Sequence, residues 1–120
     1  MSVKTHQEEI MIYCDPSSSV SKKTVAFAAT VSKHVRPVDY FKIPLTPTLM
    51  KGLLKQLNLR PKDIMNRAHP FYQENIAGRD FDNVGWLNIL IRNPQILKGP
   101  IAVRGQKAVL CDNPTNILQL

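Results

Sequence analysis

Apolar residues at the start of the chain recur with two spacings, which predict a strand, a helix and a second strand. Residues 9–14, Glu-Ile-Met-Ile-Tyr-Cys, form a short β-favouring run that is typical of a buried strand. Asp15-Pro16 interrupts the run, and apolar residues then recur at helical spacing over residues 20–34. Arg36-Pro37 is expected to end this helix, and residues 38–43 predict the second strand. Two strands joined by a helix form a right-handed parallel unit.

Helical patterns dominate the middle of the chain. Thr46 is predicted to cap a helix that has Pro47 in its first turn and a leucine-rich apolar stripe. Residues 61–67 predict a short helix that begins at a proline. Residues 69–77 predict an irregular helix that Gly78 closes.

The last third of the chain predicts an amphipathic helix, a hairpin and a final helical turn. Residues 82–92 form the helix, which is capped by its first residue and turns four apolar residues inward: Val84, Leu87, Leu90 and Ile91. Residues 101–104 and 107–111 flank Gly105-Gln106, a pattern typical of a two-residue hairpin. Residues 115–118 fit one last turn of helix. The order of elements predicts an α/β fold with a mixed sheet.

The composition indicates a single domain over residues 1–120, in which residues 1–7 form a polar leader. The chain has 120 residues, of which 43% are hydrophobic, as in ordinary globular proteins. The start of the chain lacks an apolar signal core, and the longest apolar runs are too short to span a bilayer. We therefore expect a cytoplasmic protein without a membrane partner.

Charge and ligand-forming residues narrow the possible partners. The net charge of +7 favours acidic protein surfaces, oxyanions, glutathione-like thiols or nucleic acid, although charge alone is better explained by the basic bias of an ordinary surface. Direct nucleic-acid binding is disfavoured because lysine and arginine are spread along the chain. The two cysteines and three scattered histidines lack metal-ligand spacing, so no metal is expected.

The turn between the first strand and the first helix is the place where chemistry is expected. The first turn of a helix offers unpaired N–H groups and a positive dipole, which stabilise an anion or a thiolate. The candidate oxyanion site consists of three serines and three cations: Ser17, Ser18, Ser19, Lys22, Arg67 and Lys98. The alternative is that the serines only cap the helix and the cations are only solvated.

This turn resembles the active-site loop of the ArsC/Spx family of arsenate reductase-like proteins. That loop follows an apolar strand ending in Tyr and reads Asn-Pro-x-Cys-x-x-Ser-Arg, whereas residues 12–22 read Ile-Tyr-Cys-Asp-Pro-Ser-Ser-Ser-Val-Ser-Lys. Similar segments follow in the same order at residues 63–67, 92–94, 99–103 and 109–111. The resemblance implies a thioredoxin-like, glutaredoxin-like fold. Its four-stranded sheet has the order 2-1-3-4, with helices on both sides and a helical insertion between strands 2 and 3.

The resemblance also implies that the catalytic site has changed. Ser18 stands at the position of the nucleophilic cysteine, and a hydroxyl cannot form the mixed disulfide that reduction requires. Lys22 stands at the position of an active-site arginine and lacks its bidentate fork. Three further arginine positions of the family fall on Asn66, Gly99 and Asp112. The Cys-x-x-Cys switch of the Spx branch is missing as well.

Cys14 and Pro100 carry two more expectations. A helix N-terminus near Cys14 would activate its thiol, yet its place in an apolar run favours a buried cysteine. No disulfide with Cys111 is expected, because strands 1 and 4 of such a sheet lie about 9–10 Å apart and a disulfide needs Cα atoms within about 7 Å. The resemblance implies a cis Gly99-Pro100 bond.

Two functional hypotheses follow from the resemblance. The first is a catalytically inactive pseudoenzyme that needs no cofactor and acts by binding. Its role would be a regulatory protein–protein interaction with the transcription machinery, with an RNA polymerase subunit as the partner that the Spx branch suggests. The second is a thiol- or glutathione-dependent oxidoreductase that uses Cys14.

Overall fold

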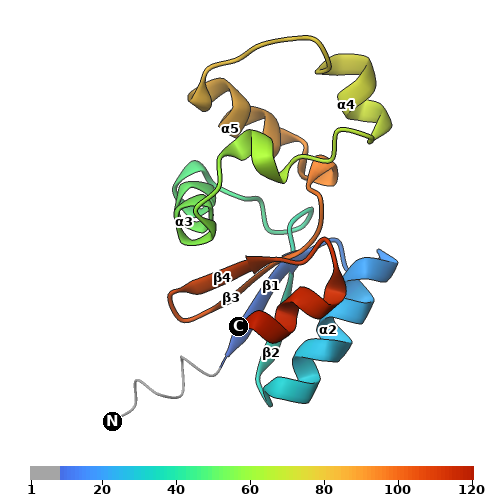
Figure 1. Ribbon diagram of the computed structural model, residues 1–120, viewed down its shortest axis with the longest axis vertical. Helices are drawn as coiled ribbons and strands as arrows, with labels where there is room; N and C mark the ends of the chain where they lie inside the picture. The colour runs from blue at the N-terminus through green and yellow to red at the C-terminus, as the bar shows by residue number, and fades with distance from the viewer. Residues whose placement is uncertain (1–8) are drawn as a thin grey trace.

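The sheet is mixed and has four strands. The computed structural model describes residues 9–120. Strand β1 (Ile10–Cys14) pairs in parallel with β2 (Val35–Asp39) and antiparallel with β3 (Ile101–Arg104), and β3 pairs antiparallel with β4 (Lys107–Leu110) (Figure 1). The observed order, β2-β1-β3-β4, confirms the predicted 2-1-3-4 sheet.

The side chains of β1 alternate between two hydrophobic cores. Ile10, Ile12 and Cys14 point to one core, which helix α2 (Ser19–Val31) and the 3-10 helix η3 (Pro114–Gln119) cover. This alternation is the period-two pattern of a strand, with one face fully buried and the other partly buried. The predicted final helical turn is therefore present as η3, which packs against α2 (Figure 1).

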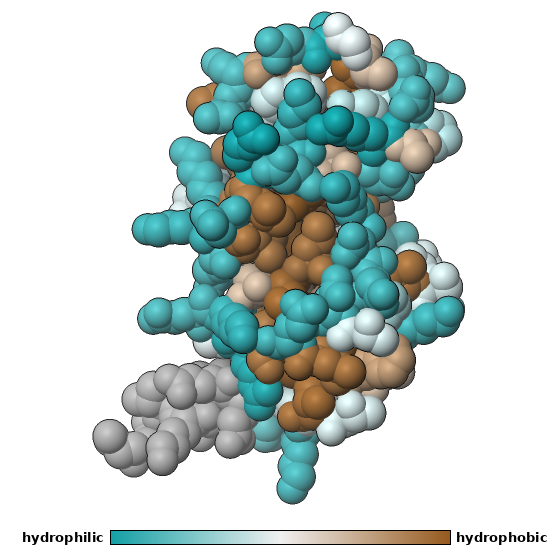
Figure 2. All heavy atoms as spheres, viewed as in Figure 1, coloured by the Kyte–Doolittle hydropathy of each residue, from teal (hydrophilic) through white to brown (hydrophobic). Residues whose placement is uncertain are grey.

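The helical insertion covers the other face of the sheet. It consists of five elements: α3 (Pro47–Leu57), η1 (Pro61–Ile64), α4 (Pro70–Asn75), α5 (Asn83–Arg92) and η2 (Pro94–Ile96). Fully buried side chains of these elements and of Met65, which follows η1, belong to the larger core: Met50, Ile64, Met65, Leu90 and Ile96. On the face shown in Figure 2, apolar side chains gather between the insertion and the sheet, and polar side chains surround them. Within the described residues, no helix is both long and apolar enough to cross a membrane.

Polar caps begin the helices of the insertion where the sequence predicts them. The Thr46 hydroxyl accepts the Leu49 N–H at 3.1 Å, and the Asp82 carboxylate accepts the Gly85 N–H at 2.7 Å. Each cap satisfies a backbone donor that has no partner within its helix. His69 caps α4 in the same way, through its ring nitrogen.

Several predicted element boundaries, and the predicted inward orientation of one residue, are wrong. Helix α2 ends at Val31 rather than at residue 34, and β2 occupies residues 35–39 rather than 38–43. Pro37 does not delay the strand, because β2 is an edge strand and its proline is paired only on the side of β1. Val84 was expected to face inward but is 61% exposed, because it lies in the first turn of α5 beside an open depression.

The predicted cis bond at Pro100 is also wrong. Residues 9–120 contain no cis peptide bond, so the Gly99-Pro100 bond is trans, the lower-energy isomer. The entry to β3 is instead made tight by Gly99, where a Cβ atom would lie 2.6 Å from the carbonyl oxygen of Cys111. The Pro100 carbonyl then accepts the Cys111 N–H at 2.7 Å. A side chain at position 99 would separate these two segments.

We predict opposite effects from two glycine substitutions. Gly52 lies within α3, and a Cβ there would meet nothing within 4 Å, so Gly52→Ala should raise the free energy of unfolding by about 0.5–1 kcal/mol. Gly99→Ala should lower it by about 1–3 kcal/mol through overpacking against Cys111. Urea unfolding followed by the fluorescence of the buried Trp86 measures both changes. A Gly99→Ala variant as stable as the parent chain would contradict the close approach.

Candidate functional site

Ser18 begins helix α2 at the carboxyl end of β1. Its backbone is extended, and its hydroxyl oxygen accepts the Ser21 N–H at 3.1 Å. The same hydroxyl donates to the Ser21 Oγ at 2.7 Å. Ser18 is thus the N-cap of α2, which confirms that one of the three serines caps this helix.

The loop before the helix is held by Asp15. The Ser17 N–H and hydroxyl both donate to the Asp15 carboxylate, at 3.0 and 2.7 Å. This arrangement turns the chain sharply between β1 and α2. It also puts a carboxylate at the entrance of α2, where a negative charge interacts favourably with the helix dipole.

A depression of about 260 Å³ lies at this helix entrance. It is lined by residues from the first loop, the end of β2, the insertion and the approach to β3: Asp15, Ser18, Val20, Ser21, Tyr40, His69, Gln95, Leu97, Lys98, Gly99 and Pro100. Of the six candidate oxyanion residues, Ser18 and Lys98 therefore come together. Ser17, Ser19 and Arg67 do not line the depression, and Lys22 lines a separate one.

Tyr40 and His69 were missed as site residues in the sequence. Burial, together with the nearby Asp15 carboxylate, raises the pKa of Tyr40 to about 12, so its hydroxyl stays protonated and able to donate. The His69 Nδ1 accepts the Phe71 N–H at 3.0 Å, which requires that this nitrogen carry no proton. A capping role was one of two expected for the histidines, but no local pattern predicts that His69 lies beside Ser18.

Both cysteines are buried free thiols. Cys14 is 1% exposed and Cys111 is fully buried. Burial raises the pKa of the Cys14 thiol, an effect that a hydrogen bond with Ser21 partly offsets. Burial, with the Asp112 charge, raises the pKa of Cys111 to about 12. Neither thiol therefore has the properties of an activated nucleophile at neutral pH.

The depression at Ser18 offers hydrogen-bonding groups and one lysine. Lys98 supplies the positive charge, and the Ser18 hydroxyl, the Tyr40 hydroxyl and backbone N–H groups of α2 supply polar contacts. Among residues 9–120, no group of three or more histidine, cysteine or acidic side chains is placed to hold a metal ion.

Comparison with known proteins gives a consistent match over almost the whole chain. The profile of the ArsC family matches residues 13–120. The uncharacterized protein YfgD of Escherichia coli (strain K12) is 24% identical over 115 residues, which cover 94% of this chain and 97% of that protein.

Two solved structures share the fold closely. A putative arsenate reductase from Yersinia pestis has a TM-score of 0.85 and 25% identity, and the match covers 93% of this chain and 100% of that one. An arsenate reductase from Vibrio cholerae has a TM-score of 0.84 and 21% identity over 93% and 97% of the two chains. With its four-stranded sheet, its helix entrance at Ser18 and a family match from residue 13 to the last residue, the chain belongs to the ArsC family.

Proposed function

We propose that this ArsC-family protein does not reduce arsenate and acts by binding another protein. The observation that carries the proposal is the hydroxyl of Ser18 at the N-terminus of α2, where the resemblance to the family implies a nucleophilic cysteine. Reduction by this family's scaffold passes through a sulfur nucleophile, because only a thiolate forms the mixed disulfide. The Ser18 oxygen is instead engaged in capping the helix.

The surroundings of Ser18 support the same proposal. Lys98 is an exposed point charge, and the Asp15 carboxylate opposes an anion in the same depression. Gly99, on which a family arginine falls by resemblance, has no room for a side chain. Similarity to a putative arsenate reductase from Yersinia pestis and an arsenate reductase from Vibrio cholerae supports a shared scaffold.

The alternative is a thiol-dependent oxidoreductase that uses Cys14. One observation favours it: Cys14 lines a depression of about 270 Å³ together with the cation Lys22. Two observations weigh against it: Cys14 is only 1% exposed, and burial raises the pKa of its thiol. We therefore rank it second.

The proposed partner is a protein with an acidic surface. A net charge of +7 favours such a surface by electrostatic complementarity. The resemblance to the Spx branch suggests a regulatory role at the transcription machinery, with an RNA polymerase subunit as the partner to test first. A pull-down with the intact chain from native cells, read by mass spectrometry, tests that choice.

We predict no arsenate turnover by the purified chain. In an assay with glutathione, glutaredoxin, glutathione reductase and NADPH, addition of the protein should leave arsenate-dependent NADPH oxidation at the blank rate. The physical reason is the missing thiolate at position 18. The arsenate reductase from Vibrio cholerae serves as the positive control.

Turnover proportional to protein concentration would contradict the proposal. If Cys14→Ala abolished that turnover, the oxidoreductase alternative would replace the proposed binding role. If Cys14→Ala retained the turnover, chemistry at another residue would be required. In each case the native fold of the variant is checked by its unfolding curve.

We also predict that both native thiols react slowly with iodoacetamide at neutral pH. A pKa of about 12 in place of 9.0 lowers the thiolate population of Cys111 by about a thousandfold at neutral pH, and burial blocks access as well. Mass spectrometry should find modification of both cysteines only after unfolding in urea. Ser18→Cys provides the contrast, because it puts a half-buried thiol at the α2 N-terminus, where the dipole lowers a thiol pKa. Rapid modification of Cys14 in the native chain would support the alternative.

A further inference from the structure

An apolar groove lies on the helical insertion, away from Ser18. A depression of about 250 Å³ is formed by α3, η1 and the first turn of α5. The buried residues Leu54 and Leu87 form its floor. Leu59 and Val84 stand at its edge and remain 37% and 61% exposed. Such clustered exposure of apolar side chains is typical of an interaction site.

The groove continues along the end of α3. A second depression of about 240 Å³ shares Leu54, Leu59 and Arg60 with the first and is bounded by Asn58. Asn58 has a left-handed backbone with φ of 57°, and the Leu59 N–H donates to the Leu54 carbonyl at 3.1 Å. This helix end turns Leu59 outward between the two depressions, so that together they form one groove.

The elements around the groove are held together before any partner binds. The Lys62 ammonium lies 5.5 Å from the centre of the Trp86 ring, which joins η1 to α5. Trp86 is itself 5% exposed and packs edge-on against Phe81. A partner would therefore meet a formed surface and would not have to order these helices.

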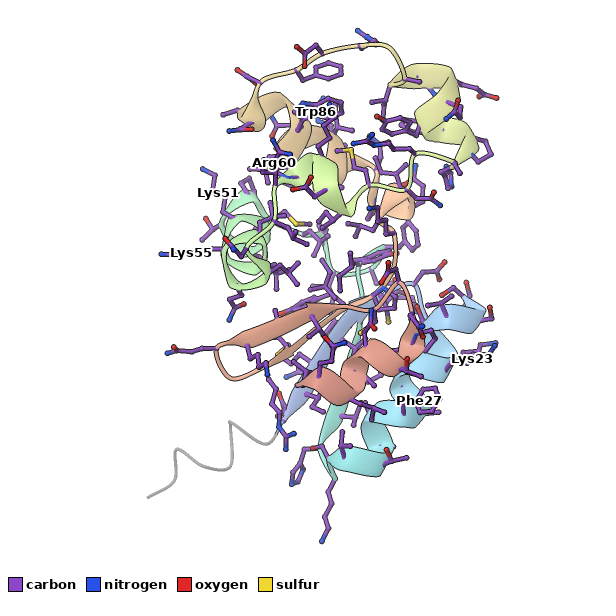
Figure 3. The ribbon with its side chains drawn as sticks, viewed as in Figure 1. Lys23, Phe27, Lys51, Lys55, Arg60 and Trp86 are labelled. Carbon is purple, nitrogen blue, oxygen red and sulfur yellow. The ribbon has the colours of Figure 1, made fainter. Side chains whose placement is uncertain are left out.

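Positive charge borders the groove. Lys51 and Lys55 project from α3, one helical turn apart, and Arg60 lies at the start of η1 on the same side (Figure 3). Among residues 9–120, no carboxylate pairs with either lysine, and no acidic residue lines the groove. Arg60 forms an exposed ion pair with Asp63 at 3.3 Å, which is of the weak surface kind.

The two lysines repel each other across one helical turn. Like charges at this spacing destabilise a helix by about 0.2–0.5 kcal/mol. An acidic group bound between them would relieve the repulsion and gain attraction to Arg60. The charges of the groove are therefore complementary to carboxylates.

We infer that this groove binds a segment of a partner protein in which large apolar side chains alternate with aspartate or glutamate. The apolar side chains would enter between Leu59 and Val84, and the carboxylates would contact Lys51, Lys55 and Arg60.

This inference rests on the proposed binding role and gives that role a surface and a partner chemistry. The groove shares no residue with the depression at Ser18. The two proposals can therefore fail separately, because peptide binding at the groove and arsenate turnover are measured independently. If the chain bound no peptide and did not reduce arsenate, the proposed binding groove would be wrong, whereas the proposed loss of arsenate reduction would still hold.

Selection of a random peptide library displayed on phage, with the intact chain as bait, tests the inference. We expect the enriched peptides to combine leucine or phenylalanine with aspartate or glutamate. The strongest peptide is then synthesised with a fluorescent label, and its affinity is measured by anisotropy at low and high salt. Binding should weaken as salt rises, since the attraction is partly electrostatic.

Two groove variants should weaken this peptide's binding at least about tenfold, the loss typical of a central contact. Val84→Glu puts a negative charge at the edge of the groove, and an acid in the first turn of α5 does not oppose the helix dipole. The double variant Lys51→Glu and Lys55→Glu reverses the charge of the border. Each variant is first shown to unfold at the same urea concentration range as the parent chain.

Matched controls carry the same chemical changes elsewhere on the surface. Leu118→Glu alters an apolar residue of η3 that is 52% exposed. The double variant Lys23→Glu and Lys33→Glu reverses two exposed charges, one on α2 (Figure 3) and one just after this helix. Both controls should bind the peptide like the parent chain. The inference is wrong if no peptide is enriched, if the enriched peptides lack acidic residues, or if groove and control variants bind equally well.

Discussion

The pairing of β1 with strands on both of its sides is the constraint on which the rest of the structure depends. Its backbone groups bond to β2 and β3, and its side chains alternate between the two cores. A strand buried in this way cannot shift by one residue, because every side chain would then change faces. Its carboxyl end is therefore held in place, and so is the loop from Asp15 to Ser18 that follows it.

Ser18, at the end of that loop, stabilises the fold independently of any chemistry at the site. Serine is among the best N-cap residues, so Ser18 stabilises α2 by hydrogen bonding to Ser21 whether or not a substrate is present. The polar depression around it is assembled from distant segments, among them Tyr40, His69 and Lys98. A scaffold of the ArsC family can thus persist with this helix entrance intact while the proposed role moves to a different surface.

The helical insertion provides that second surface. Its buried side packs against the sheet through a core that includes Met50 and Leu90. Its outer side leaves Leu59 and Val84 exposed beneath a border of lysines. Leu59 is kept out of the chain's own core by the path of the backbone after α3, where Asn58 adopts a left-handed conformation, and Val84 by its place in the first turn of α5.

The sequence by itself determined the elements whose cause is local. Caps at Thr46 and Asp82, the two-residue turn at Gly105 and the short apolar strand β1 depend on neighbours a few residues away, and each was predicted correctly. Only the tertiary structure decided the bounds of β2, the exposure of Val84 and the trans bond before Pro100. The same holds for Tyr40 and His69, which meet Ser18 in one depression. These features depend on contacts between segments that are far apart in the chain, and no local periodicity records such contacts.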